Sequence, residues 1–596
     1  MTTATAPMLT HKGGYWLLDD TPHDAVFTPE KMTDEHRMMG RTALDFVKTE
    51  VLVNLERMEA KEWDVARMLI RRCGELGLLG TDTPEAYGGL DLDKAASLVV
   101  AEGVATGASF AVTFGAMTGL AIMPILMFGT EAQKQKYLPG LVSGEQVGAY
   151  ALSESGSGSD ALGARARASV EPDGSFRLNG EKMWISNCKF ADVFIVFAKV
   201  NGEHFSAFIV ERTWPGVSTG REEHKMGLHG SSTAPLILQE VHVPKENLLG
   251  EVGKGHKVAF DVLNYGRFKL GAMSLGGAKA AIGEAAKYAA QRRQFNQPIA
   301  NFGAIKYKLG EMIAWAYATE SMLYRLAGLV DEMKAALHDQ GLDHAEALKG
   351  SLDTYSVEAS IAKVAGSEML DFVLDENVQI HGGNGFVRDY TAERYYRDAR
   401  VNRIFEGTNE INRLLVPGML MRKALKNELP LISAAMKLFD EVMSPGVPEL
   451  PGDGLLEAEQ SAVKAFKKVG LLILGAAMQK YGQKAVEEQE VLTCIADICI
   501  DIFGAESAVL RALGAAERRV ATADLQAEAA RAFVSDAAAR IDFKAKTALA
   551  AMADGDMLRT QLAALRRVLK VTPVNTVSIR RALADAAVKR GSYIFS

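Results

Sequence analysis

Hydrophobic positions change their spacing twice in the first 250 residues of the chain. From about Thr28 to Gly144 apolar residues return every three or four positions, as at Leu44, Val47 and Val51. This spacing predicts amphipathic helices, because residues three and four apart lie on one helix face. From Gly148 to about Gly250 the pattern becomes short apolar runs separated by Gly, Pro and Asn. Those runs predict strands and turns.

The strand-like runs include Asp192–Val200 and Phe205–Val210, which are rich in β-branched and aromatic residues. They predict a β domain of about 100 residues. Helical spacing returns from Gly255 to about Leu425. Several prolines and glycines then mark a linker, and an Ala/Leu-rich helical segment follows it to the last residue.

A chain of 596 residues exceeds the usual size of one hydrophobic core, so several domains are expected. We predict an α+β fold that is mostly α. Its segments are a tail (1–26) that packs on another part of the protein, a helical domain (27–147), a β domain (148–252), a helical bundle domain (253–425), a linker (426–454) and a helical extension (455–596).

Composition and charge narrow the class of protein. Hydrophobic residues make up 48% and charged residues 24% of the chain, an ordinary balance for a globular protein. The net charge of -7 argues against nucleic-acid binding, which needs a basic surface. Four scattered cysteines suit a reducing compartment and do not indicate a metal site.

The first residues do not combine a charged start with an apolar core, so they predict no signal peptide and a cytoplasmic protein. The uncharged run Gly103–Thr130 has the length of a membrane span. Polar residues and Pro124 interrupt it, so buried helices are the favoured interpretation.

Glu406 is the most informative acidic residue, because of what surrounds it. Phe405 and Gly407 flank it, and three arginines lie near it in the sequence: Arg400, Arg403 and Arg413. An apolar neighbour raises a carboxyl pKa, whereas nearby arginines lower it. A glutamate between these influences can act as a general base near neutral pH, although in isolation a solvated acid is the simpler interpretation.

Three further segments carry candidate chemistry. The Gly/Ser-rich loop Ala149–Asp160 offers N–H groups and hydroxyls to a phosphate, or is a plain turn. In Lys182–Asn187, Trp184 is either a core residue or a flat wall for a planar ring. The run Gln379–Phe386 holds three glycines that permit close backbone approach to a ligand. His381 has no partner at metal-ligand spacing, so a structural role is favoured.

In their order and spacing, these four segments resemble the acyl-CoA dehydrogenase family over about residues 40–425. The resemblance implies a helical N-terminal domain, a middle β domain and a C-terminal four-helix bundle, with FAD bound between subunits. It also implies the cofactor-binding residues: Tyr150, Leu152, Ser153, Ser159, Trp184, Ile185, Ser186, Arg292, Arg293, Gln294, Phe295, Gln379, Ile380, His381, Gly382, Gly383, Thr408, Asn409 and Glu410.

Glu406 matches the catalytic base of this family. Some members place the base just before the arginine of the first bundle helix, where this chain has Gly266. The resemblance implies that Glu406 removes the substrate α-proton, that its N–H helps to stabilise the enolate oxygen, and that a β-hydride passes to flavin N5. The implied substrate-binding residues are Ser159, Asn264, Arg267, Gly407 and Gly115.

Within the family, the chain is most similar to the very-long-chain branch. The runs Asn264–Phe268 and Val112–Gly119 and the C-terminal extension support this. Gly115 and Ala116 are small where medium-chain members close the acyl tunnel with polar side chains, which predicts a deeper cavity; close helix packing is the alternative explanation.

We therefore expect FAD-dependent dehydrogenation of long-chain acyl-CoA to trans-2-enoyl-CoA in fatty acid β-oxidation, with electrons passing to an electron-transfer flavoprotein. An acyl-CoA oxidase and a non-catalytic assembly scaffold are the alternatives. The resemblance to extended members implies a homodimer. Two segments of the extension, Val469–Met478 and Met557–Lys570, either pack on the protein's own core or contact the inner face of the membrane peripherally.

Overall fold

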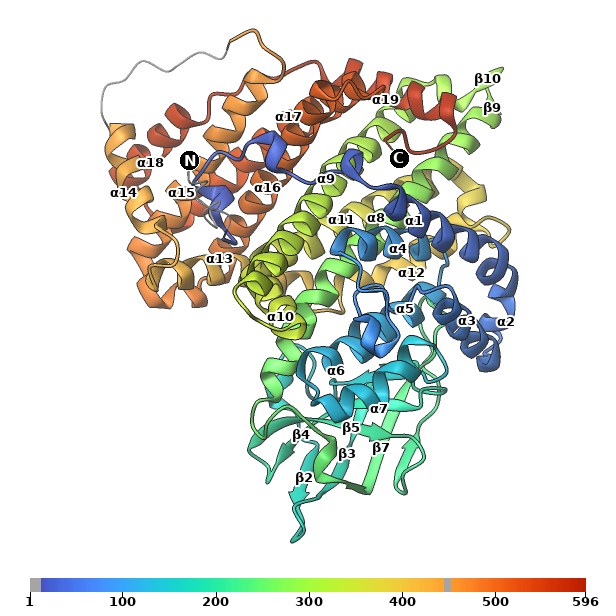
Figure 1. Cartoon of the computed structure of the whole chain (residues 1–596). Coiled ribbons are helices and arrows are strands. Elements are labelled where there is room, and N and C mark those ends of the chain that lie inside the picture. Colours follow the sequence, from blue (N-terminus) through green and yellow to red (C-terminus); the bar gives the residue numbers. More distant parts are fainter. Residues whose placement is uncertain (1–11, 444–451, 596) are drawn as a thin grey trace, which may run out of the picture.

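The computed structural model describes residues 12–443 and 452–595. Its β domain extends from one end of a helical body (Figure 1). Within that body the N-terminal helices lie on one side of a central bundle and the C-terminal extension on the other. The mostly helical α+β architecture predicted from the sequence is confirmed.

The N-terminal domain consists of short helices that are mostly buried on one face. The first of them begins at a capping box, in which Thr33 Oγ1 accepts a hydrogen bond from the His36 N–H and His36 Nδ1 accepts one from the Thr33 N–H. Such reciprocal bonds satisfy the free N–H groups of a helix start. The helices are α1 (Asp34–Phe46), α2 (Leu55–Glu59), α3 (Trp63–Glu75), α4 (Lys94–Ala105), α5 (Phe110–Gly115), α6 (Met123–Phe128) and α7 (Glu131–Val142).

A π-helix, η7 (Ala116–Ile122), joins α5 to α6, so the three form one continuous apolar segment. This segment, Phe110–Phe128, is the one helix in the described part of the chain that is long and apolar enough to cross a membrane. In the structure 83% of its most apolar window is buried inside the fold. Its burial agrees with the interpretation as core helices.

The β domain is one eight-stranded sheet in the described residues. The long strands β3 and β7 pair antiparallel, whereas β1 pairs parallel with β4. β4 is buried along nearly its whole length, which explains its continuous run of apolar residues. The strands are β1 (Gly148–Ala151), β2 (Arg167–Val170), β3 (Phe176–Ser186), β4 (Val193–Val200), β5 (His204–Glu211), β6 (Val217–Thr219), β7 (Thr233–Val243) and β8 (Leu248–Leu249).

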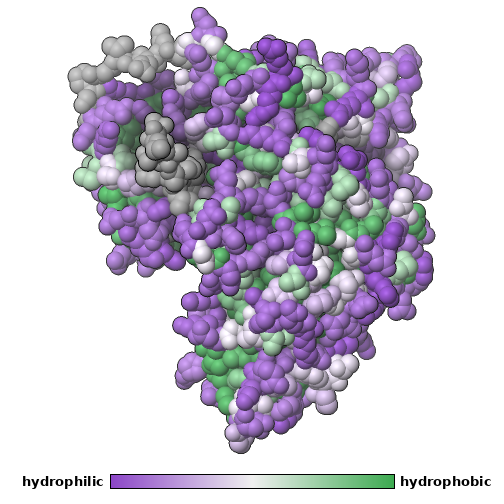
Figure 2. Space-filling view, viewed as in Figure 1, coloured by the Kyte–Doolittle hydropathy of each residue, from purple (hydrophilic) through white to green (hydrophobic). Residues whose placement is uncertain are grey.

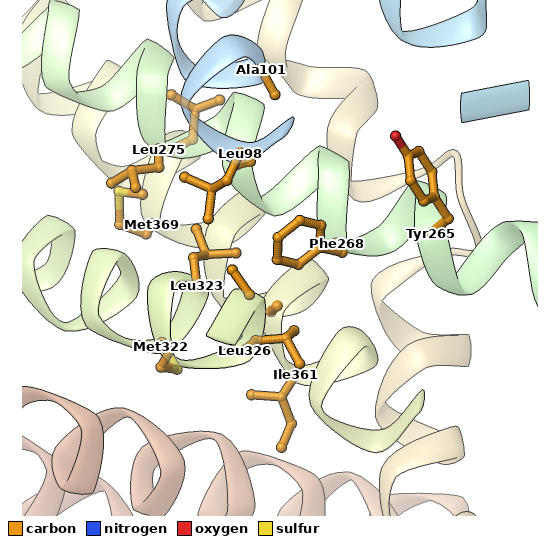
Figure 3. Packing of buried hydrophobic residues seen from close by; sticks show 14 of the residues in the cluster. Leu98, Ala101, Tyr265, Phe268, Leu275, Met322, Leu323, Leu326, Ile361 and Met369 are labelled. Carbon is orange, nitrogen blue, oxygen red and sulfur yellow. The ribbon is translucent and has the colours of Figure 1, made fainter. Parts of the chain in front are cut away.

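Long helices form the bundle that follows. Leu98 of α4, Phe268 and Leu275, Leu323 and Ile361 pack together where the N-terminal domain meets the bundle (Figure 3). The helices are α8 (Gly255–Gln291), α9 (Gly303–Asp339), α10 (His344–Thr354), α11 (Ser356–His381), α12 (Ala392–Ala399) and α13 (Asn409–Leu425). A small hairpin, β9 (Arg293–Gln294) and β10 (Gln297–Pro298), connects α8 to α9.

The extension packs on the bundle through α16, which contacts α9 and α13, while the last helix returns to α9. Its helices are α14 (Leu431–Met443), α15 (Glu457–Tyr481), α16 (Gln489–Glu517), α17 (Ala523–Met552), α18 (Gly555–Val568) and α19 (Thr576–Arg590). The region predicted as a linker, 426–454, therefore contains a helix, α14. Helical periodicity at Ile432, Met436 and Phe439 is the signal that the prolines obscured.

The two apolar segments of the extension face inward. Val469 and Ile473 of α15 are fully buried, and Leu565 of α18 is buried with Leu558 and Leu562 packed beside it. Of the two interpretations of these segments, packing on the protein's own core is the one seen in the structure. The molecular face in Figure 2 is mainly hydrophilic, with smaller apolar areas between the charged side chains.

The described part of the predicted N-terminal tail packs on the bundle. Trp16 and Leu17 are buried. Glu358 of α11 accepts hydrogen bonds from the Gly14 N–H at 2.6 Å and from Trp16 Nε1 at 2.8 Å. The segment contains short 3-10 turns at Tyr15–Leu17 and His23–Ala25, and its packing on the bundle agrees with the prediction.

Candidate functional site

The site is centred on a short loop, Glu406 to Thr408, that precedes α13. Glu406 and Gly407 have positive φ angles of +57° and +77°. A positive φ is uncommon for a residue with a side chain, and such residues cluster at functional sites. Thr408 caps α13, because its Oγ1 accepts a hydrogen bond from the Ile411 N–H at 3.2 Å. These features fix the direction in which the Glu406 side chain leaves the loop.

The Glu406 carboxylate lies against the backbone of Gly266 on α8. A β-carbon added to Gly266 would lie 2.8 Å from Cδ of Glu406 and closer still to Oε2. Because carbon atoms do not approach so closely, the glycine provides the space that the carboxylate occupies. Gly266 therefore has two effects: it places no carboxylate at the alternative position, and it leaves room for the carboxylate of Glu406.

Burial and two cations set the proton affinity of this carboxylate. Loss of solvation raises the pKa of Glu406 to about 7, and the positive charges of Arg267 and Lys363 limit the rise. Its Oε2 is closed to solvent and has no hydrogen-bond partner among the described residues. A carboxyl group with this pKa can accept a proton at neutral pH.

The sequence predicts that the cations beside Glu406 are its neighbours in the chain, Arg400, Arg403 and Arg413. For Arg403 and Arg413, whose partners are seen in the structure, this prediction is wrong. Arg403 pairs with Asp371 at 3.4 Å, and Arg413 pairs with Glu368 at 2.6 Å. The cations that act on Glu406 come instead from α8 and α11.

Arg267 and Lys363 are both buried beside the loop. Arg267 Nη1 donates to Oδ1 of Asn264 at 2.8 Å, and burial lowers the pKa of Arg267 to about 10. Lys363 Nζ donates to the carbonyl oxygen of Gly407 at 2.8 Å and to Oδ1 of Asn409 at 2.6 Å. Burial lowers the pKa of Lys363 to about 7. Nothing in the sequence around Lys363 marks it as a site residue.

An apolar cavity opens beside Glu406. Its empty volume is about 1060 Å³, including the part that is open to solvent. Gly115 and Ala116 lie on its wall, where the sequence predicts the acyl tunnel, and Ser186 lies on it as well. One face of α8 lines the cavity over four turns: Gly266, Lys269, Leu270, Met273, Gly277 and Ala280.

The other predicted substrate-binding residues are placed outside this cavity. Among the described residues, Ser159, Asn264, Arg267 and Gly407 are absent from its lining. Asn264 supports Arg267, and the Gly407 carbonyl accepts from Lys363. Arg267 and Gly407 lie beside Glu406 and Asn264 binds Arg267, whereas Ser159 is exposed on the loop after β1.

The loop after β1 is held by a buried ion pair that the sequence interpretation missed. Lys182 of β3 is completely buried, and its Nζ donates to Oε1 of Glu154 at 2.6 Å and to the Leu152 carbonyl at 3.1 Å. The Met183 N–H donates to the Ser153 carbonyl at 2.8 Å. Glu154 lies in the segment Ala149–Asp160 and Lys182 in the segment Lys182–Asn187, and their opposite charges were the sequence signal for this pair. This pair fixes Leu152 and Ser153 against β3.

Tyr150 of β1 lies near the base. Its pKa is raised by burial and by the negative charge of Glu406. Its hydroxyl is buried and has no hydrogen-bond partner among the described residues. A buried hydroxyl without a partner is costly, which indicates that another group binds it in the complete site.

β3 ends in an irregular segment that exposes a large aromatic side chain. The register with β7 shifts between Lys182 and Ile185, and Trp184 has a φ of +59°. Trp184 is 57% exposed, whereas Ile185 is buried. The interpretation of Trp184 as a core residue is therefore wrong. Ile185 contributes to the core, and any contact it makes with a cofactor uses its backbone.

The remaining predicted cofactor residues lie at the ends of the bundle helices. Arg292 directly follows α8, Arg293 and Gln294 form the exposed strand β9, and Phe295, which is 86% exposed, lies in the turn of the β9–β10 hairpin. Gln379, Ile380 and His381 are the last residues of α11, and Gly382 and Gly383 follow in an exposed 3-10 turn. Neither group borders the cavity beside Glu406.

His381 has a structural environment. Its ring stacks on Tyr288 with a centroid distance of 4.1 Å, and Nδ1 is 2.8 Å from the Asn377 carbonyl. Asn409 is also buried, with its side chain bonded to Lys363 and Ser367, so it is directed away from a ligand. Glu410, by contrast, is exposed at the start of α13.

Comparisons with known proteins match every domain of the chain. Domain models described as acyl-CoA dehydrogenase N-terminal, middle and C-terminal domains match residues 33–145, 149–241 and 253–419, and a further C-terminal domain model of that description matches 465–567. A probable acyl-CoA dehydrogenase of Bacillus subtilis is 48% identical over 98% of both chains. The human mitochondrial very long-chain specific acyl-CoA dehydrogenase is 36% identical over 82% of this chain and 75% of its own length.

A solved structure also matches nearly the whole chain. The crystal structure of an acyl-CoA dehydrogenase from Bacillus anthracis, complexed with FAD, has a TM-score of 0.96 and 48% identity. The match covers 98% of this chain and 100% of that one, so it includes the extension.

Proposed function

The chain belongs to the acyl-CoA dehydrogenase family, and from this premise we propose that it dehydrogenates long-chain acyl-CoA to trans-2-enoyl-CoA in fatty acid β-oxidation, with FAD as cofactor. The observation that carries this proposal is that Glu406 lies on the wall of an apolar cavity, where burial raises the pKa of its carboxyl group to about 7.

Glu406 accepts the α-proton of the thioester. Burial raises its pKa towards neutrality, so the ionised form can take up a proton near neutral pH, and the surrounding walls of the cavity are mostly apolar. The Glu406 N–H serves as a donor to the thioester oxygen, where negative charge develops.

The residues around β1 and β3 fit a flavin. The exposed indole of Trp184 offers a flat face, and the buried Tyr150 hydroxyl lacks a partner within the described residues. Ser153 and Ser159 would hold the phosphates and ribityl chain of FAD, together with backbone N–H groups of their loop. FAD supplies the acceptor for the hydride that leaves the substrate β-carbon.

The length of the cavity supports a long acyl chain. Its α8 wall runs from Gly266 to Ala280, about 21 Å at ~1.5 Å per residue. A zigzag chain with bonds of ~1.5 Å advances roughly 1.3 Å per carbon, so this wall matches about 16 carbons. The small residues Gly115 and Ala116 leave the middle of the cavity open.

A chain-length series tests this proposal. Enoyl product formation from saturated acyl-CoAs of 4 to about 20 carbons is measured with a dye acceptor, and kcat/KM should peak near 16. A peak between four and eight carbons would exclude the long-chain assignment. Stoichiometric hydrogen peroxide in air, without a dye, would instead identify an oxidase.

The partners are part of the same proposal. Electrons leave through an electron-transfer flavoprotein, and two chains form a homodimer in which the β9–β10 hairpin of one reaches the cofactor of the other. The high exposure of Phe295 supports this arrangement. Loss of FAD together with dissociation in Phe295→Asp, measured by sedimentation and flavin absorbance, is the expected result.

Peripheral contact with the inner face of the cytoplasmic membrane is proposed for α14. Ile432, Met436 and Phe439 are exposed along one side of this helix. An exposed apolar helix face of this kind can lie in a membrane interface. Flotation with anionic vesicles should be lost in a variant carrying Met436→Glu and Phe439→Glu; equal flotation of both proteins would exclude this contact.

A further inference from the structure

Lys363 is a buried cation that holds the loop of the base. It lies in the middle of α11 and is completely inaccessible to solvent. Its Nζ donates to the carbonyl oxygen of Gly407, 44 residues away in the sequence, at 2.8 Å. A second bond, of 2.6 Å, reaches Oδ1 of Asn409. Lysine is almost never fully buried unless it is paired, so both acceptors matter to its placement.

Close packing of two helices brings this ammonium to the loop. A β-carbon added to Gly366 of α11 would lie 2.9 Å from Cα of Gly271 on α8, so the two backbones touch. This crossing lies three residues from Lys363 on α11 and five residues from Gly266 on α8. The positions of Lys363 and Gly266 are therefore determined by the same contact between α11 and α8.

The Gly407 carbonyl is fixed from two sides. Besides Lys363, Nδ2 of Asn412 donates to it at 2.8 Å. The peptide between Gly407 and Thr408 cannot rotate without breaking both hydrogen bonds. Asn412 Nδ2 also donates to the Glu406 carbonyl oxygen at 3.4 Å, so these bonds hold the backbone on both sides of Gly407 and thereby the position of Glu406, whose φ is +57°.

We propose that Lys363 is a positioning residue for proton abstraction: by binding the Gly407 carbonyl it holds the Glu406 carboxylate over Gly266. This inference rests on the proposed function of Glu406 as the base. Lys363 makes no contact with the substrate cavity in the described structure. It acts through the loop and through its charge.

The charge has a separate, measurable effect. The charged groups that face Lys363 or Glu406 are Arg267 of α8, Glu368 of α11, Glu410 of α13 and the phenol of Tyr150 on β1. Lys363 is charged below its own pKa of about 7, and removing that charge leaves Arg267 as the main cation acting on Glu406. The ionised carboxylate then loses stabilisation, and its pKa rises.

The test compares Lys363→Met, Lys363→Gln and Lys363→Arg in the FAD-loaded enzyme. In Lys363→Met, kcat should fall about 10- to 100-fold with KM within about threefold, because a displaced base affects the reacting step. The acid limb of the pH profile of kcat/KM should move up by about one unit. Lys363→Arg keeps the charge, so the pH at which the acid limb lies should not change.

A matched control separates positioning from general destabilisation. Lys423 of α13 also donates to two carbonyl oxygens, those of Gly13 and Thr354, each at 3.0 Å. Lys423→Met should lower the thermal midpoint and leave the pH profile unchanged. If Lys363→Met does not fold, Lys363→Gln carries the test, since its amide can still donate to the loop without a charge.

The outcomes are distinct. If the parent enzyme oxidises acyl-CoA and Lys363→Met and Lys363→Gln retain both kcat and the acid limb, the inference is wrong and the function stands. If only the thermal midpoint changes, Lys363 is structural and the inference is equally wrong. If the parent enzyme oxidises no acyl-CoA, the proposed function itself fails.

Discussion

The carboxylate of Glu406 occupies the space that a side chain at Gly266 would fill, since a β-carbon there would lie 2.8 Å from Cδ of Glu406. The two positions at which this family places its base are therefore mutually exclusive in this chain. A carboxylate on α8 would displace the one on the loop. This contact determines the arrangement of the site, and a single substitution at Gly266 tests it.

Gly266→Ala should separate activity from stability. Alanine removes the helix penalty of glycine, which favours folding by roughly 0.5–1 kcal/mol. Its methyl group also pushes the flexible carboxylate aside, so kcat should fall about 10- to 100-fold. Steady-state rates and the thermal midpoint are measured on the same preparation.

Gly418→Ala is the control for this variant. Gly418 lies within α13, and a β-carbon there meets no atom within 4 Å. It should gain stability without losing activity. Full activity in Gly266→Ala would contradict the placement of the base.

The activity should depend on the ionisation of Glu406. Burial raises its pKa to about 7, so the base is protonated below this pH and ionised above it. The kcat/KM value, which reports the free enzyme, should therefore rise as the pH passes from 6 to 8 through about 7. A profile that stays flat down to pH 5 would show that the carboxyl group is not shifted, and would contradict the burial effect.

The depth of the cavity should determine which acyl chain lengths react. Gly115 is close to Met273, because a β-carbon there would lie 3.5 Å from Sδ, and Met273 is about 10 Å beyond Gly266 along α8 at ~1.5 Å per residue. Gly115→Leu should lower kcat/KM at least about tenfold for hexadecanoyl-CoA and leave hexanoyl-CoA within about threefold. Ala280→Leu, at the far end, should affect only the longest chains. Equal losses of kcat/KM on all substrates would contradict this dependence on chain length.

A buried ion-pair network joins the extension to the bundle. Arg511 of α16 is completely buried and binds Glu30 at 2.8 Å and Glu320 of α9 at 2.6 Å. Arg511→Met removes the cation that pairs with Glu30 and leaves Glu320 paired with Lys279, which should lower the free energy of unfolding by about 3–5 kcal/mol. Urea denaturation measures the loss.

The control removes an exposed ion pair of the same extension. Arg559→Met breaks a contact with Asp556 whose side chains are almost fully exposed, so its effect should stay below about 1 kcal/mol. A loss in Arg511→Met no larger than this would show that the extension does not depend on the network.

Much of the site was predictable because local motifs carry it. The loop containing Glu406, the strand end at Trp184 and the small residues Gly115 and Ala116 are each visible as short patterns. Their places in the structure follow from the order of the helices and strands. The exposed position of Trp184 was not predictable, since it depends on a register shift in β3.

The electrostatic partners of Glu406 could not be predicted from nearby residues. Arg267 and Lys363 reach it only because α8 and α11 cross closely, and that crossing depends on Gly271 and Gly366. Neighbouring arginines in the sequence point elsewhere once a helix turn separates them. The helix α14 was missed for a different reason: prolines on both sides of it suggested a linker.

In the proposed reaction Glu406 removes the α-proton of a long-chain acyl-CoA. Hexadecanoyl-CoA is mixed anaerobically with the FAD-loaded enzyme, and the long-wavelength flavin absorbance is followed by stopped flow. The parent protein should bleach rapidly, while Glu406→Gln should keep its flavin and substrate binding and bleach at least about 1000-fold more slowly. Bleaching of Glu406→Gln at the parent rate would contradict this role.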